Sequence, residues 1–274
     1  MQAEKTVRAT FNYTLDDGNV PEIFFYEPPP GTVPHMPGND PHEMEIADGW
    51  SRASSFSVDR EGFALREFSN AFDRFDDDDA VRKEFYGPVS ELVRTSVGAR
   101  RVIVFDHTIR AKVNEQQQTA EHTTTQRAPV MIVHCDYTPL SGPLRVRQLL
   151  GDEAEELLKR RVAFYNVWKP LKRRVEEKPL AMCDVTSASQ DDMLKMVLRY
   201  RERTGEIFVM RHSGAHRWWY FPKMTPETVL LLKTYDSETD GRARFLGHSA
   251  FEDPNTPPDA PVRESIEIRT IAFF

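Results

Sequence analysis

A succession of short apolar runs between Arg101 and Phe274 restricts the fold more than any other feature of the sequence. Each run combines β-branched and aromatic residues and is bounded by turn-forming residues, which is typical of β-strands. The runs do not alternate regularly with helices, so a jelly roll or barrel is favoured over a doubly wound parallel sheet. We therefore predict a mainly β protein with helical insertions. The eight runs are RVIVFDHTI (101–109), APVMIVHCDYT (128–138), RVAFYNVWKPL (161–171), TGEIFVM (204–210), RWWYFPKM (217–224), TVLLLKTYDS (228–237), RARFLGHSAF (242–251) and ESIEIRTIAFF (264–274).

Three segments have the apolar spacing of helices. They are residues 75–99, 152–161 and 189–203. In the third, Ser189 and Asp192 are spaced as a capping box, which marks a helix start. Four aspartates at 76–79 invite a metal interpretation, but negative charge is favoured before a helix start. We interpret those aspartates as structural.

The N-terminal part contains a strand pattern and a long irregular segment. Apolar and polar residues alternate over 5–14, which predicts a half-buried strand at the edge of the fold. Residues 26–44 concentrate proline, glycine and turn formers and are expected to run over the surface. Residues 54–65 predict two short extended runs around a turn at 59–62.

Composition and length narrow the class of protein. The net charge of −7 comes without a basic stripe, so nucleic acid is not an expected partner. The N-terminus has no apolar signal core, and no segment approaches the roughly 18 apolar residues that span a bilayer. Cys135 and Cys183 form no CxxC pair, which indicates a reducing compartment without a structural disulfide. We expect a cytoplasmic protein with no membrane partner, and the sequence gives no signal for its oligomeric state.

His134 and Asp136 interrupt the apolar strand PVMIVHCDYT (129–138). Side chains two positions apart on a strand share a face, so these two point the same way and Cys135 points away as inert core packing. His248 follows at the end of another predicted strand. Two histidines and one carboxylate form the facial triad of non-haem iron(II) oxygenases, which leaves positions open for a cosubstrate and oxygen. Each residue taken alone also fits a satisfied polar group in the core.

Arg263 and Ser265 lie two positions apart in VRESIEIR (262–269), shortly after His248. A guanidinium matches a carboxylate bidentately, and a hydroxyl on the same strand face donates one more hydrogen bond. The pair therefore suits the far carboxylate of a dicarboxylate. Arg269 is the competing anchor, but it has no partner equivalent to Ser265.

Seven motifs together resemble a known family. They are VFDHTIR, VHCDYT, NVWKPL, PLAMCD, HRWWYFPKM, LLLKTYDS and HSAFEDPNTPPDAPVRESIEIR. They are similar to those of the fungal asaB-like hydroxylase and desaturase group, which includes gibberellin desaturase-like proteins and the CmcJ component of cephamycin methoxylation. The resemblance runs from residue 58 to the C-terminus and implies one oxygenase domain over 1–274. Its core is then a cupin-like double-stranded β-helix in 58–274, and 1–57 is an N-terminal extension with a proline-rich loop.

The resemblance implies hydroxylation, desaturation or oxidative cyclisation of a small molecule in specialised metabolism. The implied cofactors are iron(II), 2-oxoglutarate as cosubstrate, and oxygen. The residues implied for iron are His134, Asp136 and His248, and those for 2-oxoglutarate are Arg263, Ser265 and Asn166. Candidates for substrate contact within the motifs are Arg110, Tyr137, Trp168, Lys169 and His216.

Three positions depart from the family pattern. Tyr137 stands where the family usually has Gln, Lys169 where it has Arg, and GHSAF (247–251) where it has PHTAF. None of these changes removes a proposed ligand. Tyr137 and Lys169 bear on which substrate the pocket accepts, and either Arg110 or Lys169 is a candidate anchor for a substrate carboxylate.

Two other functions stay open at this point. A cupin-like zinc or manganese hydrolase or isomerase would use the same three ligands, because affinity alone does not select iron. A non-catalytic small-molecule binder would use the same scaffold, because a fold does not determine chemistry. Oxygen uptake separates the oxygenase from the hydrolase, and the predicted cosubstrate anchor argues against the simple binder.

Overall fold

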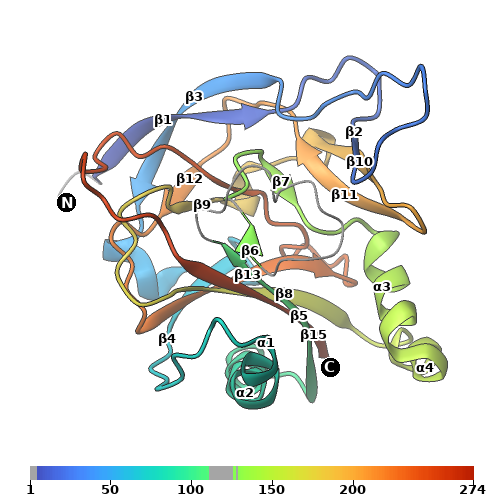
Figure 1. Ribbon diagram of the computed structural model, residues 1–274. Helices are drawn as coiled ribbons and strands as arrows, with labels where there is room; N and C mark the ends of the chain where they lie inside the picture. The colour runs from blue at the N-terminus through green and yellow to red at the C-terminus, as the bar shows by residue number, and fades with distance from the viewer. Residues whose placement is uncertain (1–4, 111–125, 128) are drawn as a thin grey trace.

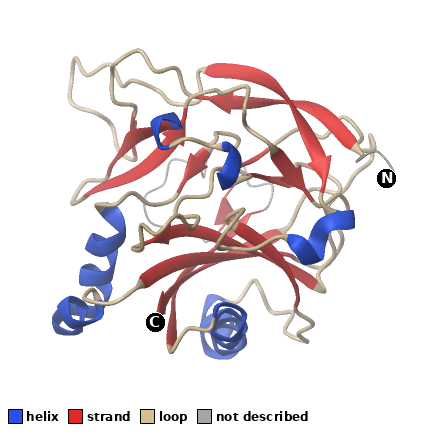
Figure 2. Cartoon of the chain, turned by 180° about the vertical axis from the view of Figure 1, so that it is seen from behind, coloured by secondary structure: helices blue, strands red, loops and turns tan. Residues whose placement is uncertain are grey.

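The computed structural model describes residues 5–110, 126–127 and 129–274, which form two β-sheets that face each other (Figure 1). The strand order is β1–β3–β12–β9–β14–β7–β11–β10–β2 in the larger sheet and β4–β13–β8–β15–β5–β6 in the smaller. Seen from behind, one helix lies below the lower sheet, further helices lie at the sides, and short helical turns lie among the loops near the upper sheet (Figure 2). The predicted jelly-roll architecture is confirmed.

The bounds of the elements are as follows. The larger sheet contains β1 (Thr6–Tyr13), β2 (Glu22–Phe24), β3 (Asp40–Asp48), β7 (His134–Cys135), β9 (Leu180–Cys183), β10 (Met193–Arg199), β11 (Thr204–Met210), β12 (Trp218–Tyr220) and β14 (His248–Ala250). The smaller sheet contains β4 (Phe63–Glu67), β5 (Arg101–Arg110), β6 (Gln126–Arg127), β8 (Val162–Pro170), β13 (Thr228–Asp236) and β15 (Ser265–Phe273). The α-helices are α1 (Asp78–Ala80), α2 (Tyr86–Val97), α3 (Ser141–Leu150) and α4 (Ala154–Leu157); a π-helical segment, Val81–Phe85, joins α1 to α2. The 3-10 helices are Trp50–Ser55, Gly151–Glu153, Val185–Ser187 and Gln190–Asp192.

The smaller sheet has an apolar outer face and a partly polar inner face. On the outer face, Val167 and Ile268 pack with Val89 and Val93 of α2, so that helix covers the sheet. β15 pairs antiparallel with β8 on one side and with β5 on the other, and the register with β5 shifts between Arg269 and Thr270. Because side chains alternate along a strand, the inner face receives the intervening residues. The polar residues of this inner face are Arg110, Asn166, Ser265, Glu267 and Arg269.

The larger sheet brings the two predicted histidines together. β7 is only two residues long, and it pairs with β11 through both His134 and Cys135 and with β14 through His134. In that second pairing His134 lies directly opposite His248. Two positions that are 114 residues apart in the chain are therefore neighbours across one strand pair.

The helix predicted over 189–203 is wrong, because most of this segment is strand. The capping box of Ser189 and Asp192 is present, but it closes a single 3-10 turn. β10 follows immediately and pairs with β11 along its whole length. Apolar residues in this segment fit both a helix and a strand spacing, and the hydrogen bonds offered by β11 decide in favour of the strand.

The N-terminal predictions are partly confirmed. β1 is the edge strand that the alternation in 5–14 predicted. The irregular segment predicted over 26–44 ends early, because β3 begins at Asp40 and pairs with β1. The helix predicted over 75–99 is present, and Asp77 caps it by accepting a hydrogen bond from the Ala80 amide at 3.0 Å. Within the described residues, no helix is long and apolar enough to cross a membrane.

Candidate metal centre

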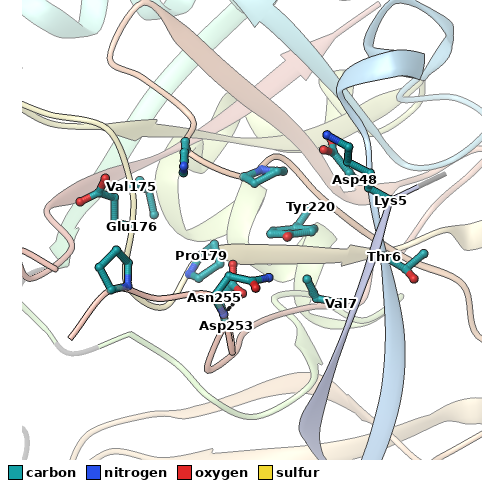
Figure 3. Close-up of a pocket in the computed structure, with 13 residues that line it drawn as sticks. Lys5, Thr6, Val7, Asp48, Val175, Glu176, Pro179, Tyr220, Asp253 and Asn255 are labelled. Carbon is teal, nitrogen blue, oxygen red and sulfur yellow. Dashed lines mark hydrogen bonds between the residues drawn. The ribbon is translucent and has the colours of Figure 1, made fainter. Parts of the chain in front are cut away.

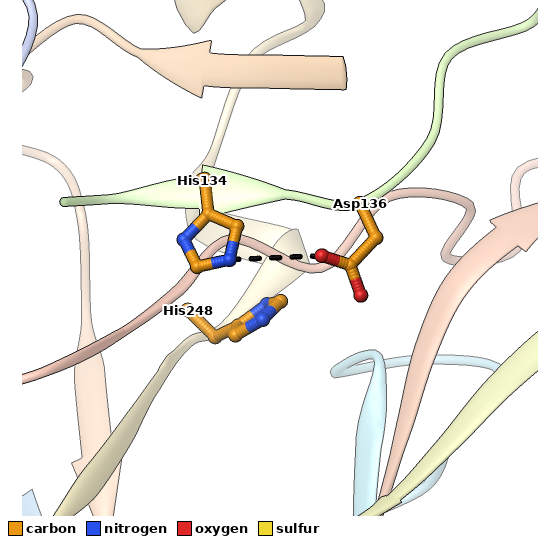
Figure 4. Close-up of side chains that lie close together, drawn as sticks. All are labelled: His134, Asp136 and His248. Atoms are coloured by element: carbon orange, nitrogen blue, oxygen red, sulfur yellow. Dashed lines mark ion pairs between the residues drawn. The ribbon is translucent and has the colours of Figure 1, made fainter. Parts of the chain in front are cut away.

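His134, Asp136 and His248 converge between the two sheets (Figure 4). One possible ligand atom of each lies within 4.8 Å of those of the other two. His134 Nε2 is 3.6 Å from Asp136 Oδ1, and the rings of His134 and His248 are 4.4 Å apart between centroids. Both histidines are buried and Asp136 is half-buried. The strand alternation that predicted a shared face for His134 and Asp136 is therefore confirmed.

Backbone carbonyl groups determine which ring nitrogen of each histidine can bind a metal. Nδ1 of His134 lies 2.8 Å from the Ile132 carbonyl oxygen, and Nδ1 of His248 lies 3.1 Å from that of Leu246. A carbonyl oxygen only accepts, so Nδ1 must carry the proton and Nε2 keeps its lone pair. Burial and the neighbouring His248 also lower the pKa of His134 to about 4, so its ring is neutral at neutral pH. This is the protonation state of a metal ligand.

Asn166 of β8 connects the metal-ligand residues to the polar inner face of the smaller sheet. Its Nδ2 donates to Asp136 Oδ2 at 2.5 Å and to Glu267 Oε1 at 2.7 Å. Glu267 in turn accepts from Arg110 and Arg269, each at 3.3 Å. Glu267 was not among the predicted site residues. The signal that could have found it is its spacing, because it shares a strand face with Arg263 and Ser265.

The side chain of Arg263 is buried, and among the described residues it forms no ion pair with a carboxylate, although Glu267 and Glu177 act on it at longer range. Its side chain is 3% exposed, Nη1 donates to the Lys178 carbonyl, and its guanidinium lies 5.7 Å from the Trp168 ring centroid. Within the described part of the chain, Arg263 Nε and Ser265 Oγ are both buried and make no hydrogen bond. Burial and the nearby Arg110 lower the pKa of Arg263 to about 9, so the group is still a cation at neutral pH.

A small cavity connects this arginine to the histidines. Its lining includes charged and polar groups and an apolar wall of Val130, Trp168, Leu180, Leu232 and Ala250. The charged and polar lining residues are Arg110, His134, His248, Ser249, Arg263 and Glu267. One small, partly open cavity is therefore lined by both histidines and by Arg263.

A larger cavity of about 440 Å³ lies elsewhere, beside the N-terminal strand (Figure 3). Tyr220 lies at its centre, with Asp48 and Lys5 on one side and Asp253 and Asn255 on another. None of the three metal-ligand residues lines it. Its walls mix lysines with carboxylates, so it has neither the charge nor the ligand set that the smaller cavity offers.

Comparisons with known proteins agree with this geometry. A family model described as an oxidoreductase/YMDC permease-like domain matches residues 10–273. The hydroxylase/desaturase efuI of Hormonema carpetanum is 32% identical over 98% of this chain and 95% of its own length. The chain belongs to the fungal hydroxylase/desaturase family. The family match begins at residue 10 rather than 58, in keeping with the pairing of β1 and β3 in the larger sheet.

Two further relatives in the hydroxylase/desaturase family carry more specific names. The Fe(II)/2-oxoglutarate-dependent dioxygenase nvfI of Aspergillus novofumigatus is 30% identical over 94% of this chain and 93% of its own. A solved structure of the iron and alpha-ketoglutarate-dependent endoperoxidase NvfI has a TM-score of 0.87 and 28% identity, covering 100% of this chain and 99% of that one. The fold is therefore shared over the whole chain.

The structure brings only some of the predicted substrate residues to the metal-ligand residues. Arg110 and Trp168 line the small cavity. Tyr137 packs on Phe164, with ring centroids 4.5 Å apart, and does not line the small cavity. Lys169 and His216 contact other parts of the protein. Lys169 donates to the Pro226 carbonyl, and His216 forms hydrogen bonds with Tyr13 and Asp192 at 3.0 and 3.1 Å.

Neither cysteine is expected to react with a thiol reagent in the native protein. Cys135 is 0% and Cys183 1% exposed, and burial raises the pKa of both thiols, so little thiolate forms. Incubation with DTNB should release almost no colour from native protein and two thiol equivalents after denaturation. Rapid native labelling accompanied by loss of activity would contradict the interpretation of Cys135 as inert core packing.

Proposed function

We propose that this protein catalyses the iron(II)- and 2-oxoglutarate-dependent oxidation of a small molecule in specialised metabolism. In this proposal His134, Asp136 and His248 hold the iron, and Arg263 and Ser265 bind the far carboxylate of 2-oxoglutarate. The observation that carries the proposal is the buried, unpaired guanidinium of Arg263 in the cavity that contains the two histidines. A buried cation without a counter-ion is strongly unfavourable, so the site is built for an anion.

The donor set fits a ferrous ion. Two imidazole Nε2 atoms and one carboxylate are the ligands of the facial triad, which leaves part of the coordination sphere open. The carbonyl groups of Ile132 and Leu246 orient the two rings through Nδ1, as partners of metal-bound histidines do. A fully closed ligand set would leave no room for a cosubstrate.

The anion site fits 2-oxoglutarate. Arg263 Nε and Ser265 Oγ are donors that lack partners, and a carboxylate would accept from both. Trp168, Leu180 and Leu232 line the cavity together with Arg263 and His248, and they offer apolar surface to the carbon chain of such a dicarboxylate.

The protein residues position the reactants and exclude water. When bound, iron with 2-oxoglutarate and oxygen supplies the oxidant that removes a hydrogen atom from the substrate. The apolar cavity wall keeps water away from the reacting centre. Arg110 is held by Glu267, and Lys169 lies outside the cavity lining, so neither supports the earlier idea of a substrate-carboxylate anchor.

The experiment that tests the proposal is a substrate screen with iron(II), 2-oxoglutarate and oxygen, read out as succinate formation. Terpenoid and polyketide scaffolds belong in the screen beside small amino acids and their derivatives. Succinate that forms only with a substrate, and only when all three components are present, is the expected result. Substrate conversion that needs neither 2-oxoglutarate nor oxygen would instead favour a hydrolase or isomerase.

Hydroxylation is the expected outcome for the substrate. A substrate whose reacting carbon is held close to the metal site would gain oxygen, whereas one held farther away would lose a second hydrogen or close a ring. The product mass should therefore rise by one oxygen atom. A mass lower by two hydrogens with no oxygen gained would overturn this expectation in favour of desaturation or cyclisation.

The cytoplasm is the proposed location. Two buried, unpaired thiols are stable in a reducing compartment and are a liability in an oxidising one. The proposed partner is a small-molecule substrate, with neither nucleic acid nor membrane as a partner.

A further inference from the structure

Glu267 is a buried carboxylate beside the metal-ligand residues, and the proposed function gives it no role. It is 5% exposed and lines the same cavity as His134 and His248. Its two oxygens have different partners. Oε1 accepts from Asn166 at 2.7 Å and from Arg269 at 3.3 Å, and Oε2 accepts from Arg110 at 3.3 Å. Burial raises the pKa of Glu267, but Arg269 and Arg110 outweigh burial and hold it below its usual range.

Asn166 links Glu267 to the proposed metal ligand Asp136, because it forms a hydrogen bond with each of them. Its Nδ2 carries two hydrogens, and the two acceptors are Glu267 Oε1 and Asp136 Oδ2. An ionised carboxylate only accepts hydrogen bonds, so the two acids together determine which way the amide points. If the amide flipped, its oxygen would face two carboxylate oxygens and both contacts would become repulsive.

The result for Asp136 is that its two oxygens are not equivalent. Oδ2 is occupied by the Asn166 amide, while Oδ1 lies 3.6 Å from His134 Nε2, among the ligand atoms. A carboxylate with one oxygen bound in this way presents the other oxygen alone to a metal. One-oxygen ligation keeps a further coordination position open.

We propose that Glu267 is a positioning residue that acts through Asn166 to hold Asp136 in one-oxygen contact with the metal. This inference rests on the proposed function, because it assumes that Asp136 is a ligand. The charge of Glu267 also matches its two cationic neighbours, because Arg110 and Arg269 both donate to it. Outer partners of metal ligands commonly set affinity by orienting the ligand, and their loss weakens metal binding about 10–100-fold.

The test compares Mn²⁺ binding to wild type, Glu267→Gln, Asn166→Ala and the double variant, measured by EPR of unbound Mn²⁺ under anaerobic conditions. Glutamine keeps the shape of Glu267 but has one acceptor and one donor, so it cannot satisfy both Asn166 and the two arginines. We expect Glu267→Gln to raise the Kd about tenfold and Asn166→Ala to raise it at least as much. The double variant should bind no more weakly than Asn166→Ala alone, because Glu267 acts through Asn166.

A second measurement reports ligand geometry rather than affinity. The visible spectrum of the Co²⁺-loaded protein depends on coordination, and we expect both single variants to shift it in the same way. If Glu267→Gln fails to fold, the variant Glu267→Gln/Arg110→Gln removes one buried positive charge together with the negative one. Thermal unfolding of each apo variant identifies those that fold.

The outcomes separate failure of the inference from failure of the proposed function. Wild-type protein that binds no Mn²⁺, or binds it equally after His248→Ala, contradicts the metal site itself. A wild-type Kd and Co²⁺ spectrum in Glu267→Gln contradict only the role of Glu267. If Glu267→Gln weakens Mn²⁺ binding equally in the presence and absence of the Asn166 side chain, Glu267 acts by charge alone. This result also overturns the inference.

Discussion

Replacement of His248 by alanine is expected to abolish oxidation and to lower bound iron from one ion per chain to almost none. Nε2 of His248 is one of three ligand atoms within 4.8 Å of one another, so its loss leaves one histidine and one carboxylate. Two ligands hold a ferrous ion too weakly to survive dialysis, and the variant then cannot bind iron and 2-oxoglutarate together. Metal content after dialysis and succinate formation are the two measurements.

A matched histidine outside the centre provides the control. His35 is half-exposed and pairs with Asp17 at 2.6 Å, and it does not line the small cavity. His35→Ala should therefore keep full metal content and activity. Far-UV circular dichroism should show that His248→Ala is folded, because β14 is held by backbone pairing with β7 and β9. Undiminished oxygen consumption in folded His248→Ala would refute the metal assignment.

The shared location of His134 and Asp136 could be predicted from sequence because it depends on a local rule. Strand alternation placed His134 and Asp136 on one face, and the same rule turned Cys135 into the core. The location of His248 opposite His134 needed a strand pairing that the sequence does not encode locally. His248 could be predicted only because the three residues occur in a known order on segments with the sequence pattern of strands.

The polar inner face could not be predicted in the same way. Glu267 is not among the residues predicted for the site, whereas the structure pairs it with Arg110 and Arg269. The contact with Arg110 depends on the register between β15 and β5, which sets Arg110 opposite Ser265, two residues before Glu267. Register depends on packing over the whole sheet. Spacing within one strand gives the face of a residue but not its partner.

Dependence on contacts outside the local sequence also explains why the helix predicted over 189–203 is wrong and why two predicted substrate residues lie outside the small cavity. Residues 193–199 are a strand because β11 is available to pair with them, which no local pattern reveals. Lys169 and Trp168 are adjacent and therefore face opposite sides of β8, so only one of them could line the cavity. The cavity contains Trp168. His216 was chosen from its motif alone, and the motif gave no information about its contacts.

Arg263 differs from Arg269 in how its charge is compensated. Arg269 contacts Glu267, Asp106 and Thr108, and the first two carboxylates outweigh burial and raise its pKa above the usual range. Among the described residues, the side chain of Arg263 contacts a carbonyl oxygen and an aromatic ring, its Nε makes no hydrogen bond, and burial and Arg110 lower its pKa. An incoming dicarboxylate therefore gains more from Arg263 than from Arg269, whose partners it would have to displace.

Arg263→Leu is accordingly expected to raise the 2-oxoglutarate concentration needed for half-maximal activity by about one to three orders of magnitude. The estimate assumes that the lost charge-assisted hydrogen bonds contribute roughly 1.5–4 kcal/mol. Iron content should be unchanged, because the arginine is not a metal ligand. Arg263→Lys keeps the charge but loses the planar fork, so its requirement should be intermediate.

The role of Arg263 can also be tested by measuring 2-oxoglutarate binding without turnover. Leucine removes an uncompensated buried cation, so the apo variant should unfold at a temperature no lower than wild type. Added 2-oxoglutarate should then raise the unfolding temperature of the Mn²⁺-loaded wild type but hardly that of Arg263→Leu, because ligand binding stabilises only the folded state. The contrary result is an unchanged 2-oxoglutarate requirement in Arg263→Leu together with a greatly increased requirement in folded Arg269→Leu. That pair of results would show that Arg269, six residues further along and already paired with carboxylates, anchors 2-oxoglutarate instead of Arg263.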